Sequence, residues 1–440
     1  MTRVYCDANP NNIRRNPGAR EIDVLLYKTI SHAPAGAAIG NQIWDEIRRM
    51  EAPVSQRAFD FLTIALAVTA ADTFVKRDNT ADGWSREFEL VVAIAEPDAW
   101  EPMRTDLETA LRFLSGDIWH IEFQNNGPHA PIPYPYGRAR TIPLQGRDCV
   151  CLYSGGLDSS IGVLDILSQG RNPVLVSHSY SRDKAIQDEV SAYFPRNISR
   201  FSSTLNPTFG HPAETSMRTR SFNFLAYGAV VASALSALTD NPLVDLLVPE
   251  NGLISLNPPL TLRRLGSLST RTTHPHFISL IQKILLALEI PARITNPYKF
   301  LTKGEMLRRC MADVNVQLPN LQQLALNTVS CGKWKRSGYQ CGRCVPCLIR
   351  RASFHAAGLI DSTTYRYPNL RNVYQNENER DDLLAIMLAI KKVQQGVDGS
   401  WLLMSGPLPE ERTERAQHVG VVQRGLQEVE NYLRSQGFVL

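Results

Sequence analysis

From residue 148 to residue 249, short strands that are apolar on both faces alternate with helices. The strands are predicted at 149–153, 173–178 and 243–249, and the helices at 159–167, 183–194 and 221–238. Strands of this kind need cover on both faces, so the alternation predicts an α/β fold with a parallel sheet between helices. Ligands bind such sheets where the strands end, which makes the loops after residues 153, 176 and 248 the candidates for a site.

The first of these loops joins its strand to its helix through two glycines and three serines. Glycine lets the backbone approach an anion closely, and a helix start directs free N–H groups and a positive dipole at it. The spacing matches neither GxxxxGK[ST] nor GxGxxG. Asp158 suits a phosphate site when Mg²⁺ is bound as well. We therefore predict that ATP is bound by Ser154, Gly155, Gly156, Leu157, Asp158, Ser159 and Ser160; a tight turn with serine caps is the alternative.

Four of the eight cysteines fall within 17 residues at the spacing C-x9-C-x2-C-x2-C. Four thiolates so spaced can close a tetrahedral zinc site with no open position, which predicts a structural role. The alternatives are an iron–sulfur cluster, which also uses CxxCxxC, and free thiols. The other cysteines are scattered, unlike a secreted disulfide framework. The predicted zinc ligands are Cys331, Cys341, Cys344 and Cys347.

Composition shifts divide the chain into four parts. Residues 1–124 predict a small α+β domain without a catalytic motif. Residues 125–147 hold five prolines and three glycines, which predicts an extended linker. Residues 148–358 form the main α/β domain, and residues 359–440 a helical extension. Hydrophobic residues in the last helix, 411–436, recur at steps of three and four, which favours docking on its own chain over binding a partner.

The net charge of +4 arises from 47 basic and 43 acidic residues. So mild a charge argues against nucleic acid as a direct ligand and is compatible with a small anionic one. No run of 18 uncharged apolar residues occurs, so no membrane-spanning helix is expected. The first twelve residues lack the apolar core of a secretory signal, and we expect a cytoplasmic protein.

The loop at 154–160 resembles that of the PP-loop ATP pyrophosphatases, and the resemblance covers residues 148–310. It implies cleavage of ATP between the α and β phosphates, transfer of AMP to an acceptor oxygen and release of pyrophosphate. Together with the cysteine segment, the chain resembles QueC, the 7-cyano-7-deazaguanine synthase family. Residues 220–225 (RSFNFL) and 296–305 (NPYKFLTKGE) are similar to two further segments of that family.

The chain departs from the QueC pattern at both ends and in one internal segment. QueC proteins lack counterparts of the first 145 and the last 80 residues. Their substrate-binding D-Y-x-x-Y-P-D-C-R stretch is replaced by residues 249–252 and 269–276. Long proteins of this kind resemble the QatC type of bacterial anti-phage Qat operons. That resemblance implies a partner protein from the same operon, docked on the N-terminal domain or the C-terminal helices.

The resemblance implies that a carboxylate of a 7-deazaguanine-type substrate attacks the α-phosphorus of ATP, after which an amine displaces AMP. Asp158 would ligate Mg²⁺, while Lys303 and Arg220 would neutralise charge on the phosphates. Glu250 follows a strand and could pair with the N1–H and amino edge of a guanine-like base. Arg218 and His274 complete the predicted substrate residues. For each of them a surface charge, a cap or loop packing is the alternative.

Three rival functions fit the same residues. The activated acid could be transferred to an amine of a partner protein. Another PP-loop branch is possible: tRNA-modifying thiolases and lysidine synthases remain, whereas asparagine-synthetase-like enzymes need a cysteine where this chain has Thr2. The third rival, from a different class, is a non-catalytic subunit that binds ATP.

Overall fold

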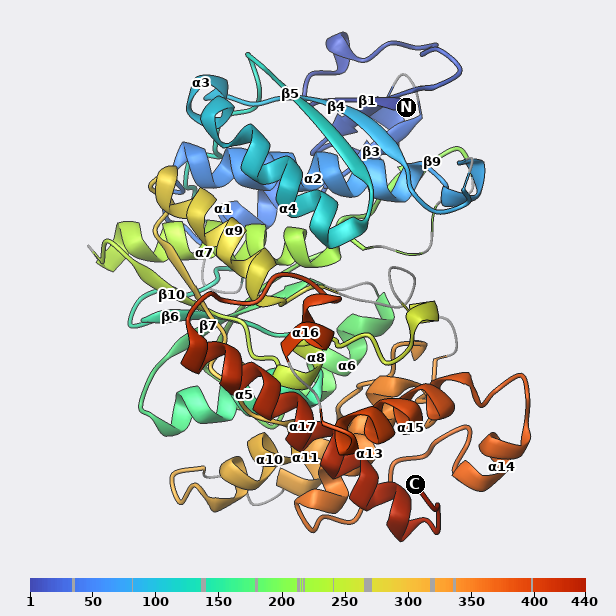
Figure 1. Ribbon diagram of the computed structural model, residues 1–440. Helices are drawn as coiled ribbons and strands as arrows, with labels where there is room; N and C mark the ends of the chain where they lie inside the picture. Colours follow the sequence, from blue (N-terminus) through green and yellow to red (C-terminus); the bar gives the residue numbers. More distant parts are fainter. Residues whose placement is uncertain are drawn as a thin grey trace.

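The computed structural model describes residues 1–440 except 34–35, 81, 136–139, 179–180, 212–213, 215, 217, 240, 265–270, 317–320, 335–337 and 397–398. Two sheets lie one above the other, with helices between them and below them (Figure 1). The upper sheet is built mainly from the first 124 residues, and the lower one from residues 149–295. Most of the C-terminal helices lie beside and below the lower sheet.

The lower sheet contains the predicted alternation of strand and helix. Its order is β11-β10-β6-β7-β8, and each pairing is parallel. The strands are β6 (Cys149–Leu152), β7 (Pro173–His178), β8 (Ser199–Ser203), β10 (Val244–Leu247) and β11 (Ala292–Thr295). The edge strands β8 and β11 were not predicted, because β8 is mostly polar and every second residue of β11 is polar, so neither is a continuous apolar run. Since β6 is central, the loop that follows it opens at the middle of the carboxyl edge.

Helices cover both faces of the lower sheet, as expected for an apolar parallel sheet. The helices that connect its strands are α5 (Leu157–Ser168), α6 (Ser181–Ser191), α7 (Arg220–Thr239), α8 (Gly252–Leu256) and α9 (Pro275–Ala287); α10 (Lys303–Ala312) and α11 (Leu321–Asn327) follow the last strand. In β6, Val150 and Leu152 pack in the cluster around α7, whereas Cys149 and Cys151 pack in the cluster around α5. This alternation of faces is the period of two that a strand imposes.

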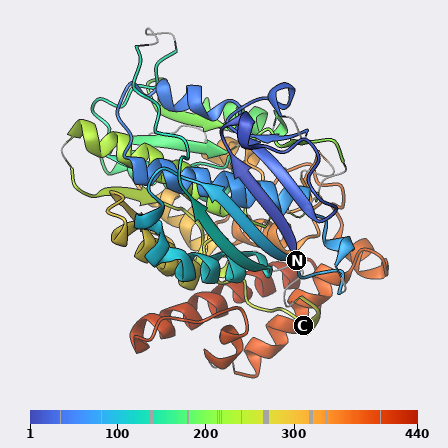
Figure 2. The same cartoon turned by 90° about the horizontal axis from the view of Figure 1, so that it is seen from above.

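The N-terminal sheet corrects the α+β expectation. Its order is β5-β4-β1-β2-β3-β9, and all pairings are parallel except β3 with β9. The strands are β1 (Thr2–Asp7), β2 (Glu21–Leu26), β3 (Ala37–Ile39), β4 (Glu87–Ala93), β5 (Ile118–Gln124) and β9 (Thr208–Phe209). Helices α1 (Ile43–Arg48) and α2 (Gln56–Phe74) connect β3 to β4, and α3 (Pro97–Trp100) and α4 (Arg104–Ser115) connect β4 to β5, whereas β1, β2 and β3 are joined without an α-helix. This unit is therefore α/β, and α2 lies beneath its strands (Figure 2).

One hydrophobic core joins the two sheets. Helix α2 packs on α7, and residues of both sheets belong to the same buried cluster. By length and composition α7 could cross a membrane, but 72% of its most apolar window is buried inside the protein. A core helix meets the same criteria, and here α7 is that helix. The hydrophobic core is continuous across the predicted boundary between the N-terminal and main domains. The division of the chain into domains stays a prediction.

The proline-rich segment 125–147 runs along the N-terminal unit. Its described residues form no helix or strand. The Ile142 N–H donates to the Arg49 carbonyl at 2.7 Å, and Ile142 and Leu144 are buried. The Ala130 N–H donates to Gln56 Oε1 at 3.0 Å. The segment is thus extended, as its prolines predict, and it packs against the fold.

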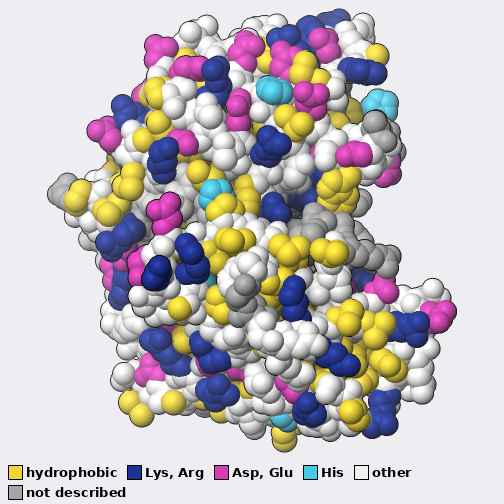
Figure 3. Space-filling view, in the orientation of Figure 1, with side chains coloured by type: hydrophobic (Ala, Val, Ile, Leu, Met, Phe, Trp, Pro, Cys, Tyr) yellow, Lys and Arg dark blue, Asp and Glu magenta, His cyan; other side chains and the backbone are white. Residues whose placement is uncertain are grey.

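The C-terminal region consists of helices that dock on the lower unit. They are α13 (Val345–Ala356), α14 (Leu370–Gln375), α15 (Asp381–Gln394), α16 (Gly399–Leu403) and α17 (Arg412–Ser435). Outside this region, short 3-10 turns lie at Pro10–Asn12, Ile30–His32, Arg77–Asn79, Glu101–Met103 and Leu262–Arg264. The hydrophobic stripe of α17, including Val422, Leu426 and Leu433, is buried in a cluster with residues of α8, α13 and α15. The stripe therefore packs against its own chain, as the sequence predicted. On the visible face, acidic and basic side chains are interspersed (Figure 3).

Candidate functional site

The glycine-serine loop (residues 154–160) follows β6 and begins α5. Gly155 has φ +77°, a conformation that glycine adopts without strain, and an added Cβ would lie 3.1 Å from Gln187 Cγ. The Ser154 N–H donates to Ser159 Oγ at 3.3 Å, and the Gly156 N–H donates to Ser154 Oγ at 3.3 Å. These contacts hold the loop in a fixed turn at the carboxyl end of the central strand.

The serine hydroxyls of the loop are largely engaged within it. Ser159 Oγ and Ser160 Oγ both donate to the Gly156 carbonyl, at 3.0 and 2.9 Å. The first N–H groups of α5 have no acceptor within the helix, as at the start of any α-helix. An anion at this position would therefore meet backbone N–H groups and the positive end of the α5 dipole.

Asp158, in the first turn of α5, is the centre of a buried polar cluster. Its Oδ2 accepts from Asn251 Nδ2 at 2.7 Å and from the Asn251 N–H at 3.2 Å. Its Oδ1 accepts from Lys303 Nζ at 2.6 Å. Burial alone would raise the pKa of Asp158, but the Lys303 ammonium and the hydrogen bonds from Lys303 and Asn251 outweigh burial and lower it. Asp158 is therefore held as an ionised carboxylate.

Glu250 lies beside this pair, directly after β10 and Pro249. Burial, followed by the nearby Asp158 carboxylate, raises the pKa of Glu250 to about 8. Glu250 is therefore neutral near pH 7 in the absence of a cation, and a divalent ion would favour its ionised form. Its backbone is fixed by Asn296, whose Nδ2 donates to the Glu250 carbonyl at 2.9 Å.

A pocket of about 210 Å³ brings these residues together. It is lined by Ser154, Gly156, Leu157, Asp158, Ser159, Pro249, Glu250, Ile254, Lys303, Val329, Ser330 and Pro346. Two predicted catalytic residues, Asp158 and Lys303, and one predicted substrate residue, Glu250, thus share one pocket with the glycine-serine loop. The lining combines helix-start N–H groups, one ammonium and two carboxyl groups.

Arg220 lies outside the lining of this pocket, next to the carboxyl end of β7. Its Nη2 forms an ion pair with Asp183 Oδ2 at 2.8 Å and donates to the His178 carbonyl at 3.1 Å. Its Nε donates to His178 Nδ1 at 3.2 Å. Since β7 is the neighbour of β6, Arg220 occupies the same edge of the sheet, one strand away from the pocket.

Arg218 and His274 also lie outside the pocket lining, at the N-terminal unit. The Arg218 guanidinium lies 3.9 Å from the Trp84 ring centre and donates to the Ser115 carbonyl at 3.2 Å. Burial, and then Arg77, lower the pKa of Arg218 to about 10. His274 caps α9, where its Nδ1 accepts the His276 N–H at 3.2 Å.

Burial is also the first cause that lowers the pKa of His274, to about 3. Its ring lies 5.1 Å from that of Phe113, so His274 is a neutral capping residue packed against α4. In the replaced segment 269–276, residues 269 and 270 lie outside the described residues.

The four cysteines predicted as zinc ligands form one buried cluster, compatible with zinc. Their four Sγ atoms lie within 4.8 Å of one another, and Cys341 Sγ to Cys347 Sγ and Cys344 Sγ to Cys331 Sγ are each 3.9 Å. Tetrahedral Zn–S bonds of about 2.3 Å place sulfurs at nearly this separation. The N–H groups of Lys333 and Cys341 donate to Cys331 Sγ, and that of Cys344 donates to Cys341 Sγ, at 3.3 to 3.4 Å. Such donors favour thiolates.

The cysteine cluster is continuous with the wall of the pocket. Val329 and Ser330 immediately precede Cys331, and Pro346 lies between two of the cysteines; all three line the pocket. The Val329 N–H donates to the Gly155 carbonyl at 3.4 Å. A metal bound by the cysteines would therefore fix the wall that faces the glycine-serine loop.

Sequence reasoning missed Asn251 as the hydrogen-bond donor to Asp158. Asn251 caps α8, where its Oδ1 accepts the Ile254 N–H, and its Nδ2 reaches Asp158. A polar residue in the short loop between a buried strand and a helix was the available signal. Gln187 was missed as well: its Nε2 donates to the Ser154 carbonyl at 3.4 Å. Its place on α6 gives no sequence signal for that contact.

No protein-family model matches the chain. Short segments are similar to curated proteins named 7-cyano-7-deazaguanine synthase. The one from Cupriavidus metallidurans is 55% identical over 42 residues, 10% of this chain and 18% of that protein. The one from Nitrosomonas europaea is 54% identical over 39 residues, covering 9% and 17%. The one from Thiobacillus denitrificans is 40% identical over 73 residues, covering 17% and 29%.

The chain thus spans less than a third of the length of these relatives. The comparisons confirm the QueC resemblance over short segments. The resemblance to the QatC type stays a prediction.

Proposed function

We propose that the protein is an ATP-dependent, adenylate-forming enzyme that activates the carboxylate of a 7-deazaguanine-type substrate and transfers it to an amine. The observation that carries this proposal is the pairing of Asp158 with Lys303 at the start of α5, in a pocket with Glu250. A helix start, an ammonium and an ionised carboxylate are the groups that ATP with Mg²⁺ requires. The short matches to 7-cyano-7-deazaguanine synthases support the substrate class.

In the proposed reaction, a substrate carboxylate oxygen attacks the α-phosphorus of ATP. The bond to the bridging oxygen breaks, pyrophosphate leaves, and an acyl-adenylate forms; an amine then attacks the acyl carbon and AMP leaves. The N–H groups at the start of α5 bind phosphate oxygens, and the Lys303 ammonium stabilises charge that develops on them. Mg²⁺, when bound, adds positive charge at the phosphates, and Asp158 is the residue to hold it. Arg220 stands one strand away as a second cation for the leaving group.

The proposed role of Glu250 is recognition of the deazaguanine base. With a divalent ion bound, Glu250 would be ionised, and its carboxylate would accept from both the N1–H and the amino group of a guanine-like edge. Because Glu250 is partly buried at the pocket, a base edge that leaves it unpaired is costly, which favours bases that carry both donors. Arg218 and His274, which lie away from the lining, are retained only as predicted substrate residues for a ligand larger than the pocket.

We further propose that Cys331, Cys341, Cys344 and Cys347 bind structural zinc. The separation of their sulfurs supports this, and four ligands leave no open position for chemistry. On the resemblance to QatC-type proteins alone, we propose a role in bacterial anti-phage defence with a protein partner. We also propose that the enzyme is cytoplasmic. The outer face of the N-terminal sheet, with exposed Glu87, His120 and Glu122, is the surface proposed for that partner.

The test is pyrophosphate release from ATP and Mg²⁺ with 7-carboxy-7-deazaguanine and ammonia. Asp158→Ala should lower the rate by about 10²- to 10³-fold, because Lys303 loses its buried ion-pair partner and Mg²⁺ its proposed ligand. The control is Asp148→Ala, an exposed residue just before the amino end of β6, with an expected rate close to that of the unchanged protein. ATP binding without pyrophosphate release for any 7-substituted deazaguanine would support the non-catalytic alternative instead.

A further inference from the structure

Lys303 occupies an unfavourable place in its own helix. It is the first residue of α10, where a positive side chain opposes the helix dipole. Thr302 caps this helix: its Oγ1 accepts the Glu305 N–H at 3.0 Å, and Glu305 Oε2 accepts the Thr302 N–H at 2.8 Å. This capping box provides one carboxylate near Lys303.

A second carboxylate reaches the same helix start from α17, 124 residues further along the chain. Glu428 Oε1 accepts from Thr302 Oγ1 at 2.6 Å, and Glu428 Oε2 accepts the Gly304 N–H at 3.2 Å. Gly304 allows this approach, since a Cβ there would lie 2.4 Å from Glu428 Oε1. Glu428 therefore satisfies an N–H group that α10 leaves without an acceptor.

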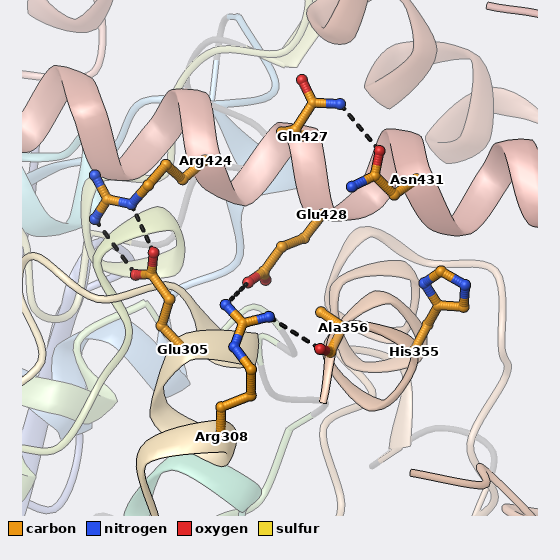
Figure 4. Close-up of a pocket in the computed structure, with 8 residues that line it drawn as sticks. All are labelled: Glu305, Arg308, His355, Ala356, Arg424, Gln427, Glu428 and Asn431. Carbon is orange, nitrogen blue, oxygen red and sulfur yellow. Dashed lines mark hydrogen bonds and ion pairs between the residues drawn. The ribbon is translucent and has the colours of Figure 1, made fainter. Parts of the chain in front are cut away.

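A neighbouring arginine of α17 fixes the other member of the capping box. Arg424 Nε donates to Glu305 Oε1 at 2.6 Å, and its Nη2 donates to the Phe300 carbonyl at 2.7 Å. Arg308, one turn into α10, lies 3.6 Å from Glu428 Oε1. These side chains meet in a groove of about 430 Å³ between α10, α13 and α17 (Figure 4). The groove lies against the helix whose first residue projects to Asp158.

We propose that Glu428 is a positioning residue for Lys303. Through Thr302 and Gly304 it fixes the two backbone neighbours of Lys303, so that the ammonium reaches Asp158 Oδ1. The helical extension thus takes part in the geometry of the site without lining the pocket. The placement of Lys303 follows from these contacts alone; the effect on catalysis rests on the proposed function.

The expected loss of rate in Glu428 variants follows from how closely Lys303 and Asp158 are held together. The Lys303–Asp158 contact is short, and both side chains are only 7% exposed. A displacement of about 1 Å at such a group can lower a rate by about 10²-fold. Replacing Glu428 by glutamine keeps an acceptor for Thr302 but presents an NH₂ group to the Gly304 N–H. The rate is therefore expected to be highest in Glu430→Gln, lower in Glu428→Gln and lowest in Glu428→Ala.

The first experiment measures Lys303 directly and needs no turnover. The full-length protein is treated with an amine-acylating reagent, and modification of Lys303 is followed by mass spectrometry of its peptide. In the unchanged protein the ion pair protects the amine; Glu428→Ala and Glu428→Gln should increase its rate of acylation severalfold. The control is Glu430→Gln, the same charge change on α17, where Glu430 contacts Gln394 and Arg434. Thermal denaturation and metal content show whether each variant is folded.

The second experiment tests the catalytic consequence. In the pyrophosphate assay, Glu428→Gln should lower kcat while the KM for ATP changes little, because the phosphate-binding N–H groups of α5 are untouched. Thr302→Ser keeps the hydroxyl that bonds Glu428 and should retain the rate, whereas Thr302→Val should behave like Glu428→Gln.

Equal acylation of Lys303 in folded Glu428→Gln, Glu428→Ala and Glu430→Gln would overturn the proposal. Increased acylation with no pyrophosphate release from any variant, the unchanged protein included, would support the positioning role and contradict the proposed function.

Discussion

Two clusters of buried charge among the described residues differ in their balance of acids and bases. Beneath the N-terminal sheet, Asp72 and Asp117 meet Arg77 and Arg86, all four at most 5% exposed. At the carboxyl edge of the lower sheet, Asp158 and Glu250 share the single ammonium of Lys303. The first cluster has equal numbers of acids and bases; the second has one acid in excess and faces a pocket.

The balanced cluster is saturated with hydrogen bonds. Asp117 accepts from Arg77 Nη1 and Nη2 at 2.8 Å each and from Arg86 Nη2 at 2.7 Å. Asp72 accepts from Arg86 Nη2 at 2.5 Å. It also accepts from the N–H and from the hydroxyl of Thr219, at 2.9 Å each. Since Thr219 immediately precedes α7, this cluster ties the two sheets together.

The difference indicates which buried charges are for structure and which are for a ligand. A balanced, saturated cluster has no capacity left for another ion. At the pocket, burial and the Asp158 carboxylate raise the pKa of Glu250 and keep this residue neutral, whereas a bound cation would lower that pKa. Perturbed carboxyl groups in a pocket are typical of functional sites.

The largest effect is expected from removing the metal that we propose for the pocket wall. Cys347→Ala should abolish binding of about one equivalent of zinc and lower the free energy of unfolding by more than about 5 kcal/mol, because structural zinc contributes directly to folding. Nucleotide binding should be lost with it, since residues 329–330 form the pocket wall. The measurements are metal analysis, denaturation and ATP titration. Cys310→Ala, equally buried but outside the cluster, is the control; equal metal content in both variants would contradict the zinc assignment.

The next largest effect separates the two charge clusters. Asp117→Asn should lower the free energy of unfolding by about 3–5 kcal/mol, because it leaves buried arginines without a counter-ion. Asp158→Asn should lower it by only about 1–2 kcal/mol, because the released ammonium of Lys303 faces a pocket that admits water. Urea denaturation of both variants measures the difference. A larger loss in Asp158→Asn would break the distinction between a structural and a ligand-binding cluster.

The smallest effect is the pH dependence that Glu250 imposes. Its pKa rises from an ordinary value of 4.5 to about 8, so between these pH values the folded protein binds a proton that the unfolded chain has lost. Stability therefore falls as pH rises through this window. Glu250→Gln removes the titration, so its stability relative to the unchanged protein should rise by about 1 kcal/mol for each pH unit between pH 5 and pH 8. Denaturation at both pH values tests this, and parallel curves would show that Glu250 titrates normally.

Local patterns in the sequence determined much of this protein. Apolar strands predicted the parallel sheet, glycines and serines predicted the loop after β6, and the cysteine spacing predicted that four cysteines lie in one cluster. Each of these depends on residues close together in the chain, where backbone geometry and periodicity act directly. The N-terminal sheet was misjudged because parallel pairing depends on how the long connections return the chain to the same end of the sheet.

Only the tertiary structure decided which distant side chains meet. Lys303 reaches Asp158 across 145 residues, and Glu428 reaches Thr302 across 126. Arg218 and His274 look equally suitable in the sequence, yet they pack against the N-terminal unit. Such contacts are set by how helices pack on both faces of the sheet, and a linear pattern of charges contains no information about that packing.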